Sequence, residues 1–174
     1  EMMNYNEAVS VIKTAILQSQ QDAVKSVNEK QLMLYFGIGK YISLNSRNGF
    51  WGKGAINAIS EQLDKELPGL RGFSARSLRY MRTFYEEWSY LDANDKPEVE
   101  MENHNLAPAG AILENNANAQ FWHPLVPKEE FPWEAFFAIG FSHHRVILSK
   151  VKDVDERLFY IKRCASERLS RDEL

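Results

Sequence analysis

Between Phe50 and Trp88 the apolar residues recur every three or four positions, in two runs separated by a break rich in proline and glycine. This period places the apolar side chains of each run on one face of a helix, and that face must be buried against another element. The first run is Ile56, Ile59, Leu63 and Leu67, and the second is Leu78, Met81, Tyr85 and Trp88. The break from Pro68 to Gly72 cannot continue a helix. The sequence therefore predicts two amphipathic helices joined by a turn.

The second of these helices has a defined start and an unusual order of charge. Ser74 suits the N-cap position, and Phe73 is available to pack just before it. Four arginines accompany the helix: Arg71 in the turn, Arg76 and Arg79 far from the apolar stripe, and Arg82 at its margin. No acid occurs between Arg71 and Arg82. Exposed arginines near a helix N-terminus oppose its dipole, at a cost of ~0.3–1 kcal/mol each.

This order of charge suits a helix that meets an anion at its N-terminus, where backbone N–H groups, the dipole and the arginines would all face that anion. Two helices around a turn are also the outline of a helix-turn-helix nucleic-acid reader. We expect such a unit over residues 53–90, with six nucleic-acid-binding residues: Lys53, Arg71, Ser74, Arg76, Arg79 and Arg82. Arg76 and Arg79 would contact phosphates or base edges, and Arg71 and Lys53 the nucleic-acid backbone. The alternative is that the arginines pair with acids elsewhere or are solvated.

The overall charge does not indicate a strongly basic nucleic-acid binder, because the net charge is −3 and the pI about 5.9. The charge is uneven, however. Residues 1–91 hold 11 Lys and Arg against 9 Asp and Glu, a net of +2, whereas residues 92–174 hold 10 against 15, a net of −5. A polyanion should therefore meet the first half. The single cysteine, Cys164, excludes a disulfide within the chain. We see neither a transmembrane run nor a secretory signal, so we expect a cytoplasmic protein with no membrane partner.

The rest of the chain predicts an all-α fold, a single domain over residues 1–174. Residues 4–44 should form one long helix, or two with a break near Gln20, and Gly37 and Gly39 would mark close helix packing. Its apolar stripes are Tyr5, Val9, Ile12 and Ile16, then Val24, Val27, Leu34, Ile38 and Ile42. Residues 92–133 are rich in Asn, Ala, Pro and Glu, and predict a long irregular insertion, with a small winged or irregular element within 92–141.

Two C-terminal helices are expected over residues 142–169. Ser142 can cap the first, which would run through Val151, and Asp153 with Glu156 forms a start resembling a capping box for the second. The apolar stripe of the second is Leu158, Ile161 and Ala165, with Arg157, Lys162, Arg163 and Arg168 outside it. Ser170 to Glu173 reads as a further helix start, inside which the chain ends.

The residues that could perform catalysis do not form a recognisable site. His143 and His144 are adjacent, so on a helix they point in different directions and make a poor metal pair. The paired acids Glu86-Glu87 and Glu129-Glu130 are expected on a solvated surface. The chain lacks a strand-borne Asp…Glu-x-Lys cluster that could hold Mg²⁺ for phosphodiester cleavage. We therefore expect no enzyme activity, cofactor or metal in this fragment.

Several stretches resemble the YhcG-type family of bacterial proteins. The family's "LYWxIGxxI…GWG" opening is similar to residues 34–42 followed by Trp51-Gly52, and its "GFSxRNLxxMRxF" signature to residues 72–84, with Ser77 at the usual Asn. The "LxWSH" turn is similar to residues 139–143, with Phe141 at the usual Trp, and residues 151–160 match "VKDxxxRxFY". The resemblance implies an N-terminal helical domain that precedes a C-terminal PD-(D/E)xK nuclease domain, which would begin after residue 174.

Two functions follow as hypotheses. The first is a nucleic-acid-binding module, with DNA as the expected partner, that positions the fused nuclease domain. The alternative is a dimerisation or protein-interaction module without direct DNA contact, in which the apolar stripe of the long N-terminal helix pairs with a second copy of the chain.

Overall fold

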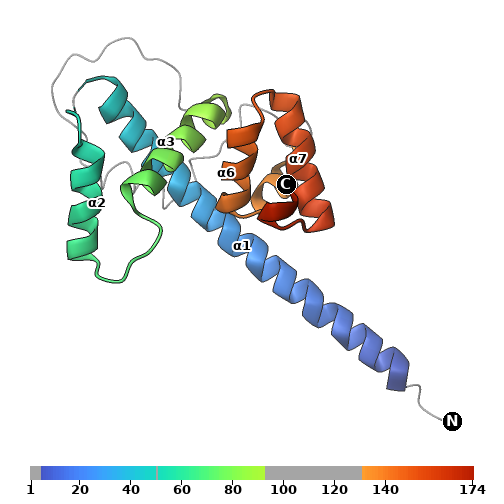
Figure 1. Ribbon diagram of the computed structural model, residues 1–174. Coiled ribbons are helices and arrows are strands. Elements are labelled where there is room, and N and C mark those ends of the chain that lie inside the picture. The colour runs from blue at the N-terminus through green and yellow to red at the C-terminus, as the bar shows by residue number, and fades with distance from the viewer. Residues whose placement is uncertain (1–4, 50, 93–130) are drawn as a thin grey trace.

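The computed structural model describes residues 5–49, 51–92 and 131–174, with side chains in the first half of the long helix described at residue 16 and from residue 22 onward. The expected all-α fold is confirmed (Figure 1). Three helices precede the segment 93–130: α1 (Tyr5–Arg47), α2 (Ala55–Glu66) and α3 (Ala75–Trp88), which continues into the 3-10 turn η1 (Ser89–Leu91). After it come α5 (Trp133–Ala138), α6 (Phe141–Lys150), α7 (Val154–Glu167) and the 3-10 turn η2 (Arg171–Glu173).

The long helix α1 is continuous, so the alternative with a break near Gln20 is wrong. Its C-terminal half packs along α3, and its N-terminal half projects away from the rest of the molecule (Figure 1). The crossing is close at Gly39, where an added Cβ would lie 2.1 Å from the carbonyl oxygen of Met81. The expectation that Gly37 and Gly39 mark close helix packing is therefore confirmed at Gly39.

The second apolar stripe predicted for α1 is only partly buried. Val24, Val27 and Leu34 are 59%, 64% and 45% exposed. The buried face is instead the one that carries Leu32 and Phe36, because α3 and α5 pack on that side of the helix. The opposite side therefore lacks a partner element within the described residues.

The two helices around the Pro/Gly break form as predicted, with one difference. Leu67 is the C-cap of α2 and is 50% exposed, so it does not belong to the buried stripe. Helix α2 ends at Glu66, so Leu67 no longer follows the helical path that would place it on the buried face. The connecting loop is held to α2 by Ser60, whose hydroxyl donates to the carbonyl of Phe73 at 2.9 Å.

Helix α3 lies at the centre of the structure. Ser74 is its N-cap, as predicted, and the hydroxyl accepts a hydrogen bond from the backbone N–H of Ser77 at 3.1 Å. The predicted stripe is buried, together with Phe84, which the stripe did not include: Leu78, Met81, Phe84, Tyr85 and Trp88. One side of α3 is therefore core along its whole length.

An aromatic cluster joins the two parts of the chain. Phe84 of α3 stacks on Phe136 of α5 with ring centroids 6.0 Å apart, and meets Phe141 of α6 edge-on at 5.6 Å and Phe36 of α1 at 6.2 Å. These rings come from four helices, so burial of Phe84 links all of them.

The region 92–141 departs from the expectation of an irregular or winged element. Trp133 to Ala138 is helical, and Phe131 and Trp133 are 5% and 8% exposed, so this stretch packs on the body of the molecule. Asp92, assigned to the insertion, is fully buried and accepts a hydrogen bond from Lys40 Nζ at 2.6 Å. The remainder of the predicted insertion, residues 93–130, lies outside the described residues.

The C-terminal helices form close to their predicted positions. The first begins at Phe141 with Gly140 as N-cap, so Ser142 is inside the first turn and does not cap it. Asp153 does cap α7, by accepting a hydrogen bond from the N–H of Glu156 at 2.9 Å. Arg157 was expected outside the apolar stripe, but it is only 4% exposed. Its burial is possible because it donates to the carbonyl of Val151 at 2.8 Å and pairs with Glu87 at 2.5 Å.

Candidate nucleic-acid interface

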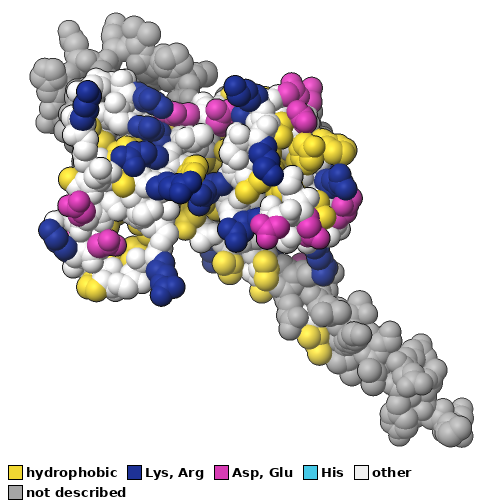
Figure 2. All heavy atoms as spheres, viewed as in Figure 1, with side chains coloured by type: hydrophobic (Ala, Val, Ile, Leu, Met, Phe, Trp, Pro, Cys, Tyr) yellow, Lys and Arg dark blue, Asp and Glu magenta, His cyan; other side chains and the backbone are white. Residues whose placement is uncertain are grey.

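The face of α3 opposite the core forms one exposed stripe of four residues: Arg76, Arg79, Thr83 and Glu87. The stripe begins with two arginines, and its acid lies at the C-terminal end. Lys and Arg side chains gather over α3 in the middle of the molecular face in Figure 2, whereas Asp and Glu side chains lie toward the margins of that face. The positive end of the stripe is the part where an anionic partner would be attracted.

Arg76 and Arg79 are both exposed, as predicted, and both are held by neutral groups. Arg76 donates from Nε and Nη2 to the hydroxyl of Tyr80 at 3.2 and 3.1 Å. Arg79 donates from Nη2 to Oδ1 of Asn57 in α2 at 2.8 Å. Neither guanidinium lies within 4 Å of a carboxylate oxygen of the described residues. Their positive charge is therefore positioned without being neutralised there.

Arg82 occupies a different environment from the other two. It is half buried and donates from Nη1 to the hydroxyl of Ser46 in α1 at 3.1 Å. Burial lowers the pKa of Arg82 from its usual value, and nearby Arg47 adds to that effect. This side chain ties α3 to α1 and is the least accessible of the predicted arginines.

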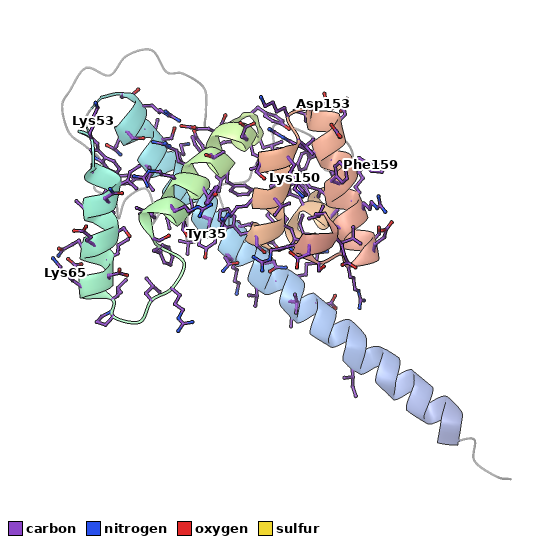
Figure 3. All side chains as sticks on the ribbon, viewed as in Figure 1. Tyr35, Lys53, Lys65, Lys150, Asp153 and Phe159 are labelled. Carbon is purple, nitrogen blue, oxygen red and sulfur yellow. The ribbon has the colours of Figure 1, made fainter. Side chains whose placement is uncertain are left out.

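The structure does not gather all six predicted residues. Lys53 and Arg71 are exposed, but they flank opposite ends of α2, and a helix of 12 residues is about 18 Å long. Figure 3 shows Lys53 beside the start of α2, at the far end of that helix from Lys65. Ser74 is exposed, and its hydroxyl caps α3. The compact group therefore consists of Arg76 and Arg79, with Arg71 in the loop before them.

One cation near this group was missed at the sequence level. Arg145 of α6 places its Cζ atom 3.8 Å from the centroid of the Tyr80 ring, and Arg76 Cζ lies 5.6 Å from the same centroid. The available signal was weak: residues 141–150 contain no acid to neutralise Arg145. Proximity of α6 to α3 is a tertiary feature, so sequence spacing could not reveal it.

The acids at the end of α3 are both ion-paired, and only Glu87 is exposed as expected. Glu86 accepts hydrogen bonds from Ser43 Oγ and Arg47 Nε, each at 2.9 Å. Burial acts to raise the pKa of Glu86, but the hydrogen bonds from Arg47 and Ser43 outweigh it and lower that pKa. Glu87 pairs with the buried Arg157. Both acids therefore join α3 to neighbouring helices, away from its arginines. Glu129-Glu130 lies outside the described residues.

His143 and His144 are held by backbone carbonyls. His143 Nε2 donates to the carbonyl of Leu169 at 2.8 Å, and His144 Nε2 donates to that of Phe136 at 2.9 Å. Within the described parts of the chain, no three His, Cys, Asp or Glu residues are grouped so as to hold a metal ion. None of the described helices combines the length and apolar character needed to cross a bilayer.

Comparison with known proteins gives two matches. The family model described as the DUF1016 N-terminal domain matches residues 11–174. The chain is also 30% identical over 154 residues to the Escherichia coli (strain K12) protein named "Putative nuclease YhcG". That similarity covers 83% of this chain and 36% of the relative, so the chain spans well under half of the relative's length. No solved structure matches the chain significantly.

Proposed function

Because the chain belongs to the DUF1016 N-terminal domain family, we propose that it is a nucleic-acid-binding module, with DNA as its partner, that positions a nuclease domain fused to it. The nuclease part of this proposal comes from the name of the similar Escherichia coli protein, of which this chain matches only a part. The binding part comes from the exposed face of α3.

The observation that carries the proposal is the charge of that face. Arg76 and Arg79 lie one helical turn apart on the exposed side of α3, and each is oriented by an uncharged hydrogen-bond partner. Elsewhere in the described structure, Arg47, Arg157 and Arg163 are paired with carboxylates. A guanidinium that is oriented but not neutralised can donate two parallel hydrogen bonds to a phosphate.

The arrangement differs in one respect from a typical helix-turn-helix. The connection from Leu67 to Ser74 is longer than the usual three- or four-residue turn. We therefore propose α3 as the helix that contacts the nucleic acid, with Arg71 in the longer loop as a backbone contact. Lys53, at the other end of α2, would add a contact only to a nucleic acid that extends along that helix.

Binding can be measured by fluorescence anisotropy of a labelled DNA duplex over a salt series, with the double variant Arg76→Ala and Arg79→Ala. We expect the slope of log K against log salt to fall by about 0.9 per lost phosphate contact. The melting temperature should hardly change, because substitutions at exposed positions usually alter stability by within about 0.5 kcal/mol.

The matched control is the double variant Lys65→Ala and Lys150→Ala, which removes the same charge from exposed positions in the last turns of α2 and α6. It should keep the parent slope. If the parent chain does not bind DNA, or if both double variants behave alike, the proposed function is wrong. A large drop in melting temperature for the arginine variant would instead assign those side chains a structural role.

The second candidate function, a dimerisation module, is favoured by a separate observation on α1. Ile16, Val27 and Leu34 are 52%, 64% and 45% exposed. At about 100° per residue, they lie within about 20° of one another around the helix. An apolar line of this kind on a projecting helix suits pairing with the same helix of a second copy. The two functions are compatible, because this line lies on α1 and the arginines lie on α3.

A further inference from the structure

Tyr80 brings together two cations from different helices. Arg76, one turn before it in α3, donates to its hydroxyl, and Arg145 of α6 lies over its ring with Cζ 3.8 Å from the centroid. We call Arg76, Tyr80 and Arg145 the Tyr80 cluster. Stacking on an aromatic face is a favourable position for a guanidinium.

The cluster holds positive charge that the described residues do not balance. Two guanidiniums around one ring repel each other, yet neither has a carboxylate oxygen within 4 Å among the residues that the structure describes. An anion with several acceptor oxygens would relieve this repulsion.

The cluster is prepared for such an anion before it arrives. Tyr80 fixes one guanidinium through its hydroxyl and supports the other on its ring, so less side-chain entropy is lost on binding. The two arginines also lower the pKa of Tyr80, first through the hydrogen bond from Arg76 and then through Arg145, as expected where positive charge is concentrated.

We propose that Arg76, Tyr80 and Arg145 together hold a single phosphodiester group of a bound nucleic acid. This inference rests on the proposed function and adds α6 to the interface. A phosphodiester is favoured over a carboxylate partner because the neighbouring cation on the same stripe, Arg79, also lacks an acidic partner in the described structure. A polyanion would satisfy Arg79 and the cluster at the same time.

The test is a mutant cycle of Arg76→Ala and Arg145→Ala, measured by DNA anisotropy from about 50 to 200 mM salt. Each single variant should lower the salt slope by about 0.9 and weaken binding about fivefold to tenfold near 0.1 M salt. Because both side chains hold the same phosphate, the double variant should lose the same single unit of slope, not two. Lys150→Ala, on the same helix as Arg145, is the charge-matched control and should keep the parent slope.

The outcomes separate this inference from the proposed function. If Arg79→Ala reduces the slope while Arg145→Ala behaves as Lys150→Ala does, only the inference is overturned. If the double variant loses two units of salt slope, the two arginines contact two separate phosphates. That result also overturns the inference. If Arg145→Ala melts at a lower temperature than the parent, Arg145→Gln replaces it in the test. This variant keeps a polar side chain without the charge and should show the same change in salt slope. If inorganic phosphate binding depends on Arg145 but the DNA slope does not, the ligand is the free ion and the inference is wrong.

Discussion

At the scale of single residues, the ion pair between Lys40 and Asp92 is the most buried charge interaction in the described structure. The side chain of Asp92 is fully buried, that of Lys40 is 16% exposed, and their atoms Nζ and Oδ2 are 2.6 Å apart. A buried pair gains little over an apolar replacement, but removing one partner takes away the opposite charge that stabilises the other. The pair therefore stabilises the packing of the end of η1 against α1 only while both side chains are present and charged.

Lys40→Met should therefore lower the free energy of unfolding by about 3–5 kcal/mol, measured by urea denaturation. The double variant Lys40→Met with Asp92→Leu should recover much of that loss, because neither charge of the pair is then buried without the other. Lys53→Met removes an exposed lysine and serves as the control, with an expected change of about 0.5 kcal/mol or less. Equal losses for the single and double variants would contradict this account.

His144 is the second residue whose burial has a measurable consequence. Its ring packs on Phe136 with centroids 4.5 Å apart, and its Nε2 donates to the carbonyl of the same residue. Burial lowers the pKa of His144 from 6.5 to about 4. Between these two values the unfolded chain binds a proton that the folded chain does not, so the folded state loses stability as the pH falls.

We expect His144 to contribute stability fully above pH 6.5 and to lose about 3 kcal/mol of it as the pH falls to about 4. An NMR titration of the imidazole nitrogens reports the ring directly and should show no protonation of His144 until the pH approaches 4. In urea denaturation, His144→Gln should reduce the dependence of unfolding free energy on pH over this window. A His144 ring that titrates near 6.5 would contradict the assignment.

At the scale of elements, the contact between α1 and α3 organises the fold. The two helices approach at Gly39, where any side chain would meet the backbone of Met81, with an added Cβ 2.1 Å from its oxygen. Gly in a helix interior costs roughly 1 kcal/mol relative to Ala. The packing between α1 and α3 at this crossing must therefore stabilise the fold by more than the glycine destabilises the helix.

Gly39→Ala should therefore destabilise the protein by about 1–3 kcal/mol, although helix propensity alone would make it stabilising. Thermal unfolding followed by circular dichroism gives the sign of the change. Gly52→Ala is the control, because an added Cβ there meets no atom within 4 Å and the backbone does not need a positive φ. A rise in melting temperature for Gly39→Ala would show that the helices separate easily at this crossing.

At the scale of the whole molecule, α1 gives the protein a shape with a projecting arm. The body holds the core and the arginines of α3, and the arm extends away from both (Figure 1). The line of exposed apolar residues runs from the arm toward the body, through Ile16, Val27 and Leu34. If this line pairs with a second copy, the assembly would place two α3 surfaces at fixed relative positions.

Light scattering should then give a dimer at micromolar concentration, and Val27→Glu with Leu34→Glu should convert it to a monomer. These changes place charge on an interface but leave the core untouched, because both side chains are exposed in the single chain. Phe159→Glu is the matched control, since Phe159 is 59% exposed on α7 and lies at the edge of the molecule in Figure 3. A parent chain that is monomeric at this concentration rules out the dimerisation module.

The features that depend on neighbours along the chain could be predicted from the amino-acid sequence. The period of apolar residues predicted α3, the side-chain oxygens of Ser74 and Asp153 predicted helix starts, and the Pro/Gly break predicted the loop between α2 and α3. The exposure of Arg76 and Arg79 could also be predicted from the sequence, because it depends on the angle around α3 between each arginine and the apolar stripe of that helix. The family resemblance is confirmed by the match over residues 11–174.

Which charges are buried and which cations lie close together depends instead on how the helices pack in three dimensions. Lys40 and Asp92 are 52 positions apart, and Arg157 and Glu87 are 70 apart, so neither pair has a local signal. The face of α1 that becomes core was ambiguous because the helix carries apolar residues on both sides, and the choice belongs to α3 and α5. Arg145 reaches Tyr80 only because α6 packs beside α3. Contacts between elements depend on how the helices pack against one another. The period of apolar residues along one helix does not specify that packing.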